Sequence, residues 1–333
     1  MRKSVLCFGL TPVLQRTLVF EALEPNEVNR AKQVVESAAG KALNTARALS
    51  VLGTPAQVAG FNGGVAGRKI EAFLKTYGVV SAQTQMRAET RICTTLLDRK
   101  GNTVTELVEE APLPDKAALA RFEKTNLKRA KAASMLVISG TLPPFASDDF
   151  YVRFVQAAAK ENVPVVIDSH KAALIHVLFE RPYVAKLNVR ELEATLQIAL
   201  KTEREIFRAM KDLVGMGAQN VFVTHGANAA YLLTADGRAW RFAPPRVPRP
   251  VNPIGSGDCT TAGLVHALLR KKPLTDAVAL GLACGSANIT SLTPADFNAA
   301  HVRALVGKVK IKVSARPGIR GAPQGGADIP VFG

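Results

Sequence analysis

The sequence is poor in the residues that would mark a disulfide-linked or metal-stapled protein. Its 333 residues include only four cysteines and five histidines. The cysteines, Cys7, Cys93, Cys259 and Cys284, are far apart and form no C-x-x-C pair. Their spacing therefore indicates neither a zinc site nor a disulfide framework. Without disulfides, the reducing cytoplasm is the expected compartment.

Long apolar runs without polar side chains are missing as well. Residues 277–295 carry no charge, but Ser286 and Pro294 make them a poor membrane span. The amino terminus places Arg2 and Lys3 before an apolar run, as signal peptides do, but it has no A-x-A cleavage site. A buried first strand is the better interpretation, and we expect a soluble protein without a membrane partner.

Acidic side chains are scarce relative to basic ones. The chain has 43 lysines and arginines against 27 aspartates and glutamates, a formal net charge of +16. Such an excess favours nucleic acid, an anionic surface or a small polyanionic ligand. The long acid-free run 298–327 contains no aromatic side chain that could stack on bases. We therefore expect a phosphorylated small molecule, with nucleic-acid binding through this run as the alternative.

Short apolar runs alternate with helix-sized segments along most of the chain. Continuous apolar strands separated by helices are typical of a parallel sheet that is buried on both faces. The sequence therefore predicts an α/β fold with a mostly parallel central sheet flanked by helices. The predicted strands are 4–10, 56–61, 134–140, 163–169, 182–188 and 219–225, and the predicted helices include 41–52, 66–77, 115–131, 147–161, 202–214 and 258–270.

Two segments interrupt this alternation. Residues 11–36 and 88–110 contain strand-like pieces with interspersed polar residues and no helix between them. Such pieces suit a small sheet that stands off the main layer. This small sheet could be a passive dimerisation surface. We expect instead that it is a lid over a cleft and that it also forms the contact of a homodimer. The predicted division is a core of residues 1–10, 37–87 and 111–316, a β-lid of 11–36 and 88–110, and a flexible Gly/Pro-rich tail of 317–333.

A glycine loop precedes the last of the predicted helices. Gly255, Ser256, Gly257 and Asp258 gather unobstructed backbone N–H groups at a helix amino terminus, an arrangement that binds anions. The structural alternative is a plain turn capped by Asp258, but a cap needs no glycine on both sides of Ser256. The loop is not a dinucleotide fingerprint, because Thr260 stands where the third glycine belongs.

We interpret this loop as part of a phosphoryl-transfer site. The amides of residues 255–258 would stabilise the charge on a transferred phosphoryl group. Asp258 would accept the proton of the attacking hydroxyl. The loop therefore predicts both a phosphate cradle and a catalytic base.

Six blocks of the sequence together resemble the ribokinase-like carbohydrate kinases of the phosphofructokinase-B branch, most closely the 1-phosphofructokinase and tagatose-6-phosphate kinase group. VNPIGSGDCTTAGL is similar to the carboxy-terminal signature of that family, and AAGKALNTARALSVLG to its amino-terminal signature. GFNGGVAGRKIEAFL, TELVEEAPLP, ISGTLPP and VTHGANAAYLL follow in the family's order and spacing. The resemblance covers residues 3–314. It implies a three-layer ribokinase-like fold with a small β-sheet lid that often dimerises.

The resemblance also implies roles for individual residues. Asp258 matches the catalytic base, and Gly255, Ser256 and Gly257 match the anion hole. Asn188 and Glu191 match the N-x-x-E motif, which supports Mg²⁺ at the nucleotide phosphates through water. The remaining matches are Lys41 and Arg91 for the sugar's own phosphate, Gln15, Gly40 and Asn44 for the rest of the sugar, and Thr224, Gly226, Gly257 and Asn288 for the nucleotide.

The departures from the family pattern lie on the sugar side. Gln15 stands where a carboxylate is usual, and its hydrogen bonds to sugar hydroxyls would be uncharged and weaker. Ala39 and Ala42 stand where glycines are usual, and Cys93 and Val108 where asparagines are usual. Losing hydroxyl-binding groups can alter selectivity strongly. We therefore expect a working kinase whose acceptor has moved away from the standard ketohexose phosphate.

Together these observations predict an ATP-dependent sugar kinase that uses Mg²⁺. It would transfer the γ-phosphoryl group of ATP to a hydroxyl of a phosphorylated hexose such as fructose 1-phosphate, fructose 6-phosphate or tagatose 6-phosphate. One alternative is a kinase for an unphosphorylated sugar or a nucleoside. The other is a non-catalytic binding protein of the same fold. An acceptor panel with ATP and magnesium separates these three.

Overall fold

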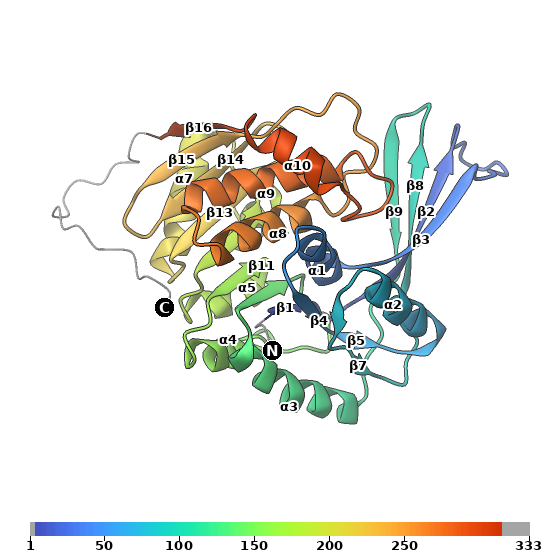
Figure 1. The fold of residues 1–333 in the computed structure, drawn as a ribbon, viewed down its shortest axis with the longest axis horizontal. Helices are drawn as coiled ribbons and strands as arrows, with labels where there is room; N and C mark the ends of the chain where they lie inside the picture. Colours follow the sequence, from blue (N-terminus) through green and yellow to red (C-terminus); the bar gives the residue numbers. More distant parts are fainter. Residues whose placement is uncertain (1–3, 315–333) are drawn as a thin grey trace.

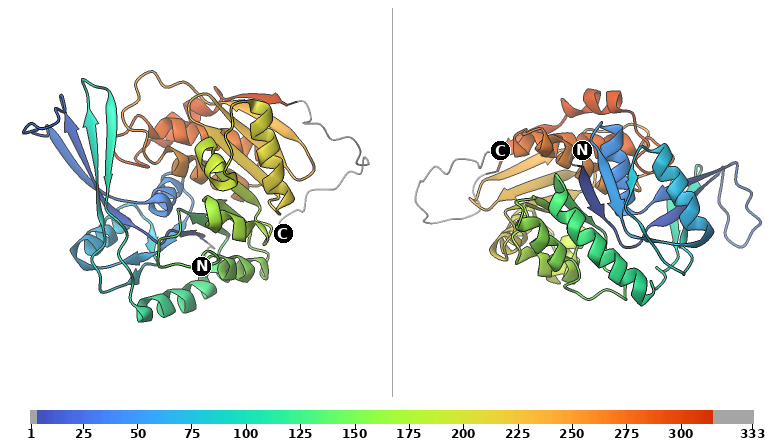
Figure 2. Two further views of the ribbon diagram at one scale, coloured as in Figure 1. Left: turned by 180° about the vertical axis from the view of Figure 1, so that it is seen from behind. Right: turned by 60° about the horizontal axis from the view of Figure 1, so that its bottom comes forward.

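The computed structural model describes residues 4–314, so the predicted tail of 317–333 lies outside the described residues. A ten-stranded central sheet dominates, with a four-stranded sheet projecting from one side of the layered core (Figure 1). A two-stranded sheet of β5 (Phe61–Asn62) and β7 (Thr84–Gln85) lies beside them. Figure 2 shows the same projection from two other directions.

The central sheet has the strand order β16-β15-β14-β13-β12-β11-β10-β1-β4-β6. It is parallel from β6 to β13, and β14 to β16 then add antiparallel strands at one edge. All six predicted strands are present within it. The strands are β1 (Val5–Phe8), β4 (Ala56–Ala59), β6 (Val80–Ser81), β10 (Met135–Ser139), β11 (Val165–Asp168), β12 (Val184–Asn188), β13 (Asn220–His225), β14 (Ala229–Thr234), β15 (Ala239–Ala243) and β16 (Lys310–Val313).

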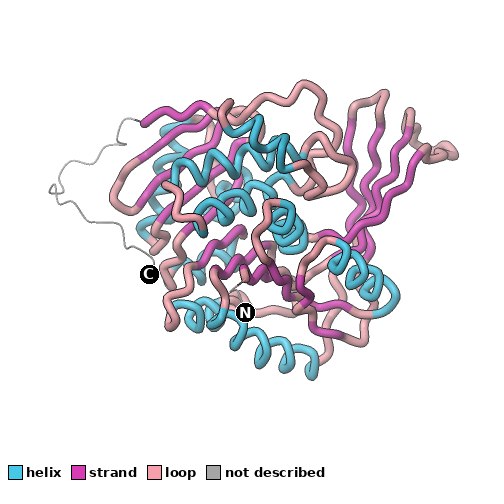
Figure 3. Tube along the Cα trace, in the orientation of Figure 1, coloured by secondary structure: helices cyan, strands magenta, loops and turns pink. Residues whose placement is uncertain are grey.

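Helices cover both faces of this sheet, which gives the predicted three layers (Figure 3). Alternate residues of β1 show the division: Leu6 and Phe8 pack into one core cluster, and Val5 and Cys7 into the other. The first face is covered by α3 (Lys116–Ala132), α4 (Val152–Ala159), α5 (Lys171–Leu178), α6 (Val189–Leu196) and α7 (Glu203–Gly215). The second is covered by α1 (Lys41–Val51), α2 (Gly64–Thr76), α8 (Ser256–Leu269), α9 (Leu274–Asn288) and α10 (Ala299–Val306).

The four-stranded sheet, called the side sheet below, comprises β2 (Val13–Phe20), β3 (Gln33–Ala39), β8 (Ile92–Asp98) and β9 (Thr103–Val108) in the order β3-β2-β8-β9. Its strands come from the two segments in which the sequence predicted a separate sheet. β3 runs past the predicted boundary at 36 because it leads directly into α1 through Gly40, whose φ of 111° favours glycine.

α8 was predicted as 258–270 and begins two residues earlier, at Ser256. α9 was not predicted: it is buried nearly all round and packs against α8, so its sequence carries no polar stripe. The predicted helix 147–161 begins only at Val152, because the residues before it form turns. Within residues 4–314, no helix is both long enough and apolar enough to cross a membrane.

Candidate active site

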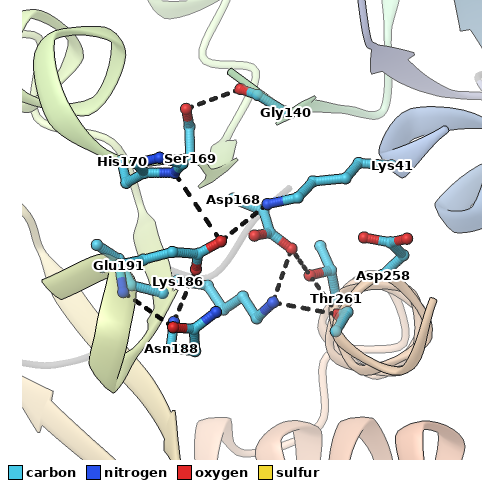
Figure 4. A network of polar contacts seen from close by, with 12 residues as sticks. Lys41, Gly140, Asp168, Ser169, His170, Lys186, Asn188, Glu191, Asp258 and Thr261 are labelled. Atoms are coloured by element: carbon cyan, nitrogen blue, oxygen red, sulfur yellow. Dashed lines mark hydrogen bonds and ion pairs between the residues drawn. The ribbon is translucent and has the colours of Figure 1, made fainter. Parts of the chain in front are cut away.

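The predicted chemical residues meet where several parallel strands end. The carboxyl ends of β11 and β12 face the amino termini of α1, α6 and α8, and side chains from all five elements converge there (Figure 4). Ligands of open α/β sheets bind at this edge. The order of the elements thus places the glycine loop and the N-x-x-E motif on opposite sides of one site.

Asp258 lies in the first turn of α8 but does not cap it. The N-cap is Gly255, and Asp258 is the third helical residue. Its carboxylate Oδ2 instead accepts a hydrogen bond of 2.7 Å from Nδ2 of Asn44 in α1. The alternative interpretation of Asp258 as a plain N-cap is therefore wrong.

At two glycines of the loop, a side chain would come close to a neighbouring residue. Gly255 has φ of 82°, and a Cβ there would lie 2.7 Å from Cβ of Pro294. A Cβ on Gly257 would lie 3.0 Å from Nζ of Lys186. One glycine is needed for the turn and the other for the close approach of a lysine.

The four amides of the loop are not equivalent. The Ser256 amide already donates to the Pro253 carbonyl. No described residue accepts a hydrogen bond from the amides of Gly255, Gly257 and Asp258, which lie at the positive end of the α8 dipole. Three of the four predicted donors are therefore ready to receive an anion.

The Asp258 carboxyl is 6% exposed and sits among charges of both signs. Burial, and then the negative charge of Asp168, raise its pKa to about 7, although Lys41 and the hydrogen bond from Asn44 oppose the shift. A carboxylate with a pKa near neutrality is suited to take a proton from a hydroxyl.

A buried ion pair between two strands of the central sheet supports the site. Asp168 and Lys186 are register partners on β11 and β12, with Nζ 2.8 Å from Oδ2, and their side chains are 1% and 4% exposed. Lys186 also donates to the Gly257 carbonyl at 3.2 Å, and Thr261 of α8 donates to Asp168 at 2.6 Å. Burial opposes ionisation of Asp168, but the ammonium groups of Lys186 and Lys41 hold its pKa below the ordinary value. This network fixes the first turns of α8 against the sheet.

A second ion pair crosses the site. Nζ of Lys41, the first residue of α1, lies 2.9 Å from Oε1 of Glu191 in α6. Oε2 of Glu191 accepts the backbone N–H of Asn188, and the Asn188 side chain accepts the N–H of Glu191, which completes a capping box. Nδ1 of His170 lies 3.9 Å from the same Oε1 and makes no hydrogen bond.

Carboxylates surround the Lys41 ammonium. Burial lowers its pKa, but the charges of Asp168, Glu191 and Asp258 outweigh this and raise the pKa above the ordinary value. Lys41 is therefore positively charged throughout the physiological pH range. It is placed between the two sides of the site, as Figure 4 shows.

A cavity of about 320 Å³ opens beside this ion pair. Near it, Oγ of Ser139 and Oδ1 of Asn44 are buried without a hydrogen-bond partner, which leaves polar atoms for a ligand. The cavity is lined by Gly9, Thr11, Pro12, Gly40, Lys41, Ala42, Leu43, Arg91, Ser139, Gly140, Thr141, His170 and Glu191.

The structure separates the other predicted acceptor residues. Arg91 lines the cavity, but its guanidinium donates to the carbonyls of Thr11 and Glu109. Gln15 does not line the cavity: it is buried in the side sheet and donates to Oγ1 of Thr95.

The departures in the side sheet lie next to one another. Gln15 on β2 is the register partner of Cys93 on β8, and Cys93 is the partner of Val108 on β9. Ala39 lies at the end of β3, and Ala42 follows in the first turn of α1. Gln15, Cys93 and Val108 therefore form one row across three strands.

The predicted nucleotide residues are only partly together. Asn188 and Thr224 are register partners at the ends of β12 and β13, and Gly226 lies in the exposed turn that follows. Asn288 is 1% exposed, and its side chain holds the glycine loop by donating to the Ile254 carbonyl and to Oγ of Ser256. The structure gives Asn288 a supporting place behind the loop.

A larger cavity of about 460 Å³ lies between the segment before the glycine loop and α10. It contains three arginine or lysine side chains that form no ion pair with a described residue. Its lining residues are Arg246, Val247, Pro248, Arg249, Thr290, His301, Leu305 and Lys308.

The donors at the site suit a hard cation that keeps its water. Among the described residues, no group of three or more His, Cys, Asp or Glu side chains could hold a metal ion by itself. Oδ1 of Asp168 is buried without a partner, and Glu191 supplies a second carboxylate, whose oxygens now accept hydrogen bonds from Lys41 and from the Asn188 amide. Mg²⁺ is usually bound by one or two carboxylates together with water and phosphate. The residues present fit an ion of that kind.

Sequence reasoning missed Asp168, Lys186, Ser139 and His170. A signal existed for two of them. Asp168 is the last residue of the fully buried strand VVID, and Lys186 interrupts the apolar run VAKLN. A charge inside a buried strand requires a partner of opposite sign. Opposite charges on two neighbouring buried strands are therefore expected to form a pair. Nothing in the pattern marks His170.

A family model described as pfkB family carbohydrate kinase matches residues 2–299. Tagatose-6-phosphate kinase of Staphylococcus epidermidis is 28% identical over 271 residues, which cover 80% of this chain and 86% of that protein.

Solved structures share the fold. Escherichia coli phosphofructokinase-2 in complex with fructose 6-phosphate superposes with a TM-score of 0.83 at 23% identity, covering 92% of this chain and 99% of that one. Arabidopsis thaliana ribokinase complexed with ribose and ATP gives 0.73 at 18% identity, with coverage of 92% and 99%. The predicted ribokinase-like fold is confirmed, and the chain belongs to the pfkB family of carbohydrate kinases.

Proposed function

We propose that the protein transfers the γ-phosphoryl group of ATP to a hydroxyl of a phosphorylated sugar. The observation that carries this proposal is the environment of Asp258. Its carboxylate has a pKa raised to about 7, is held by Asn44, and shares the mouth of α8 with three amides that have no acceptor among the described residues. A base and a phosphoryl cradle thus lie together.

The acceptor hydroxyl would lose its proton to Asp258 as it attacks the phosphoryl group. Asn44 donates a hydrogen bond to Asp258 through Nδ2, and its Oδ1 has no partner. Asn44 can therefore orient the base and at the same time accept a hydrogen bond from a sugar hydroxyl. The Gly257 and Asp258 amides would stabilise the charge on the transferred group. In our proposal, closure of the side sheet excludes water that would otherwise hydrolyse ATP.

The phosphate of the acceptor would bind in the 320 Å³ cavity. Lys41 reaches the cavity from the amino terminus of α1, whose amides also favour an anion. Arg91 completes one wall while its guanidinium holds the backbone at Thr11. This arrangement supports a phosphorylated acceptor over a free sugar.

The nucleotide would extend from the glycine loop toward the 460 Å³ cavity. The segment that lines this cavity continues into the loop, and the Val251 amide donates to the Ile289 carbonyl next to Thr290. We assign the Mg²⁺ that accompanies ATP to Glu191, Asn188 and Asp168 through water; the ion would neutralise phosphate charge.

A coupled assay across acceptors tests the proposal. With ATP and Mg²⁺ we expect turnover of at least one among fructose 6-phosphate, fructose 1-phosphate and tagatose 6-phosphate. Free fructose and tagatose should be poorer by about 10- to 100-fold in kcat/KM, because they lack a charge-assisted contact worth roughly 1.5–3 kcal/mol. Preference for a free sugar or a nucleoside would favour the unphosphorylated alternative, and no turnover of any acceptor would favour a binding protein.

We further propose a homodimer formed through the side sheet. Val34, Leu18 and Leu96 share one row of its outer face, and Leu107 lies on the neighbouring strand. Val34 and Leu107 are 50% and 53% exposed, so they contribute an open apolar patch to this face, beside the Arg16–Glu36 pair of the same face.

A double variant, Val34→Glu with Leu107→Glu, should convert the dimer into a monomer in light scattering after size-exclusion chromatography. Both positions are exposed, so the fold should persist. Val313→Glu, at a 79% exposed position on β16, is the matched control and should stay dimeric. A monomeric wild type, or a double variant that remains dimeric, would contradict this assignment.

A further inference from the structure

We propose that the Lys41–Glu191 ion pair is a specificity gate. An anionic group on the acceptor breaks this ion pair, and the released carboxylate of Glu191 can then bind the metal ion of the nucleotide. This inference rests on the proposed function and adds to it: it says why the acceptor must carry a phosphate. It also predicts that acceptor and nucleotide binding are coupled.

The two partners belong to different halves of the site. Lys41 lies at the amino terminus of α1, next to Asn44, which holds the base. Glu191 lies in the first turn of α6, beyond the end of β12. Their 2.9 Å contact joins residues 150 positions apart, and both side chains line the same cavity.

Without ligands, both carboxylate oxygens of Glu191 are engaged. One accepts a hydrogen bond from Lys41, and the other accepts the Asn188 amide. The Lys41 ammonium makes one hydrogen bond, to Glu191, and is also attracted by two further carboxylates, Asp168 and Asp258. While the pair is closed, Glu191 therefore has no free oxygen for the metal side, and the charge of Lys41 is directed at carboxylates rather than at a phosphate.

Breaking the Lys41–Glu191 pair costs free energy. The ligand that binds first bears this cost, and the second ligand does not bear it again. A phosphate that attracts Lys41 leaves Glu191 with an oxygen free for the hydrated ion. The metal-bound nucleotide would in turn release Lys41. Each ligand therefore makes the other's binding easier, which is positive coupling and must be reciprocal.

An unphosphorylated sugar cannot open the gate. Its hydroxyls form uncharged hydrogen bonds, which are about half as strong as charge-assisted ones and do not replace a carboxylate at an ammonium group. A free sugar would leave Glu191 bound to Lys41. The gate thus selects acceptors by charge rather than by the pattern of their hydroxyls.

The test measures acceptor binding by calorimetry without metal or nucleotide. We expect Glu191→Gln to bind fructose 6-phosphate or tagatose 6-phosphate about 10-fold more tightly than the wild type, within the 5- to 150-fold range usual for coupling between sites. Glutamine can keep the capping box, so the variant removes the charge and keeps the helix start. The affinity for free fructose should not change.

A matched control is present in α7. Glu205 closes a capping box with Thr202 in the same way, on an exposed helix start. Glu205→Gln should leave the affinity for both sugar phosphates unchanged. In the wild type, the non-hydrolysable nucleotide analogue with Mg²⁺ should tighten sugar-phosphate binding by a similar factor of about 10, and should not tighten fructose binding.

The outcomes separate the gate from the proposed function. If the wild type phosphorylates and binds a sugar phosphate but Glu191→Gln binds it no more tightly, the gate is wrong and the kinase assignment stands. The same holds if Lys41→Met leaves sugar-phosphate affinity unchanged, because Lys41 would then serve the nucleotide alone. If the wild type neither binds nor phosphorylates any sugar phosphate, both proposals fall.

Discussion

Replacing Asp258 with asparagine should lower kcat by about 10²–10⁴-fold, the usual contribution of a positioned general base. The amide cannot accept the proton of the attacking hydroxyl. Its oxygen can still accept the hydrogen bond from Asn44 that the carboxylate accepts at 2.7 Å, so the loop should keep its shape. Steady-state kinetics at saturating ATP and acceptor measure the effect.

The pH dependence gives an independent check on the same residue. In the wild type, kcat should rise with pH through an apparent pKa of about 7, because only the ionised Asp258 is a base. The residual activity of Asp258→Asn should lack this step. A variant that keeps nearly full activity, or the same step in its pH profile, would contradict the assignment.

The stability of the fold should change with pH in the direction opposite to kcat. The folded pKa of Asp258 lies above the ordinary value of 3.8, so the folded protein holds this proton after the unfolded chain has released it. This residue therefore lowers stability as the pH rises from about 4, and the loss is complete above about 7. At pH 8, Asp258→Asn should raise Tm by a few degrees, whereas Asp276→Asn removes a favourable charge from the first turn of α9 and should not raise Tm or change kcat.

Lys186→Met should lower the free energy of unfolding by about 3–5 kcal/mol, because it leaves the carboxylate of Asp168 buried without its closest counter-ion. The side chains of this pair are 4% and 1% exposed, so water cannot take the place of the lost ammonium. The Gly257 carbonyl also loses a donor, which should disturb the first turn of α8 and reduce kcat. Denaturant unfolding measures the loss.

The control uses a lysine in a similar pair at the surface. Lys69 lies 2.7 Å from Glu36, but these side chains are 47% and 34% exposed. Lys69→Met should change the free energy of unfolding by no more than about 0.5 kcal/mol. Adding Asp168→Asn to Lys186→Met should cost less than the sum of the single changes. A Lys186→Met protein as stable as the wild type would show that the buried pair does not hold α8.

Much of the fold follows from local patterns. The segment 88–110 was predicted to contain strand-like pieces with interspersed polar residues, and β8 and β9 lie within it. α1 occupies the predicted helix 41–52, and Gly53, whose φ of 76° favours glycine, follows its end. The antiparallel edge of the central sheet that contains β14 and β15 was not predicted. β14 is fully buried and β15 is partly buried, and no helix separates them, so the alternation of strands and helices does not reveal them.

The site could be predicted only where one motif carries the chemistry. The glycine loop and Asp258 are contiguous, so their meeting is determined by the start of one helix. The contact between Lys41 and Glu191 depends on the packing of distant elements, and sequence spacing contains no information on its distance. Gln15 was expected to contact the sugar, yet its bond to Thr95 depends on strand register.

The alignment of Gln15, Cys93 and Val108 across three strands has a consequence for how substitutions there combine. Residues at one level on adjacent strands share neighbours. Changes at contacting positions are usually non-additive. We therefore expect the effect of replacing all three residues together to differ from the sum of the three single replacements.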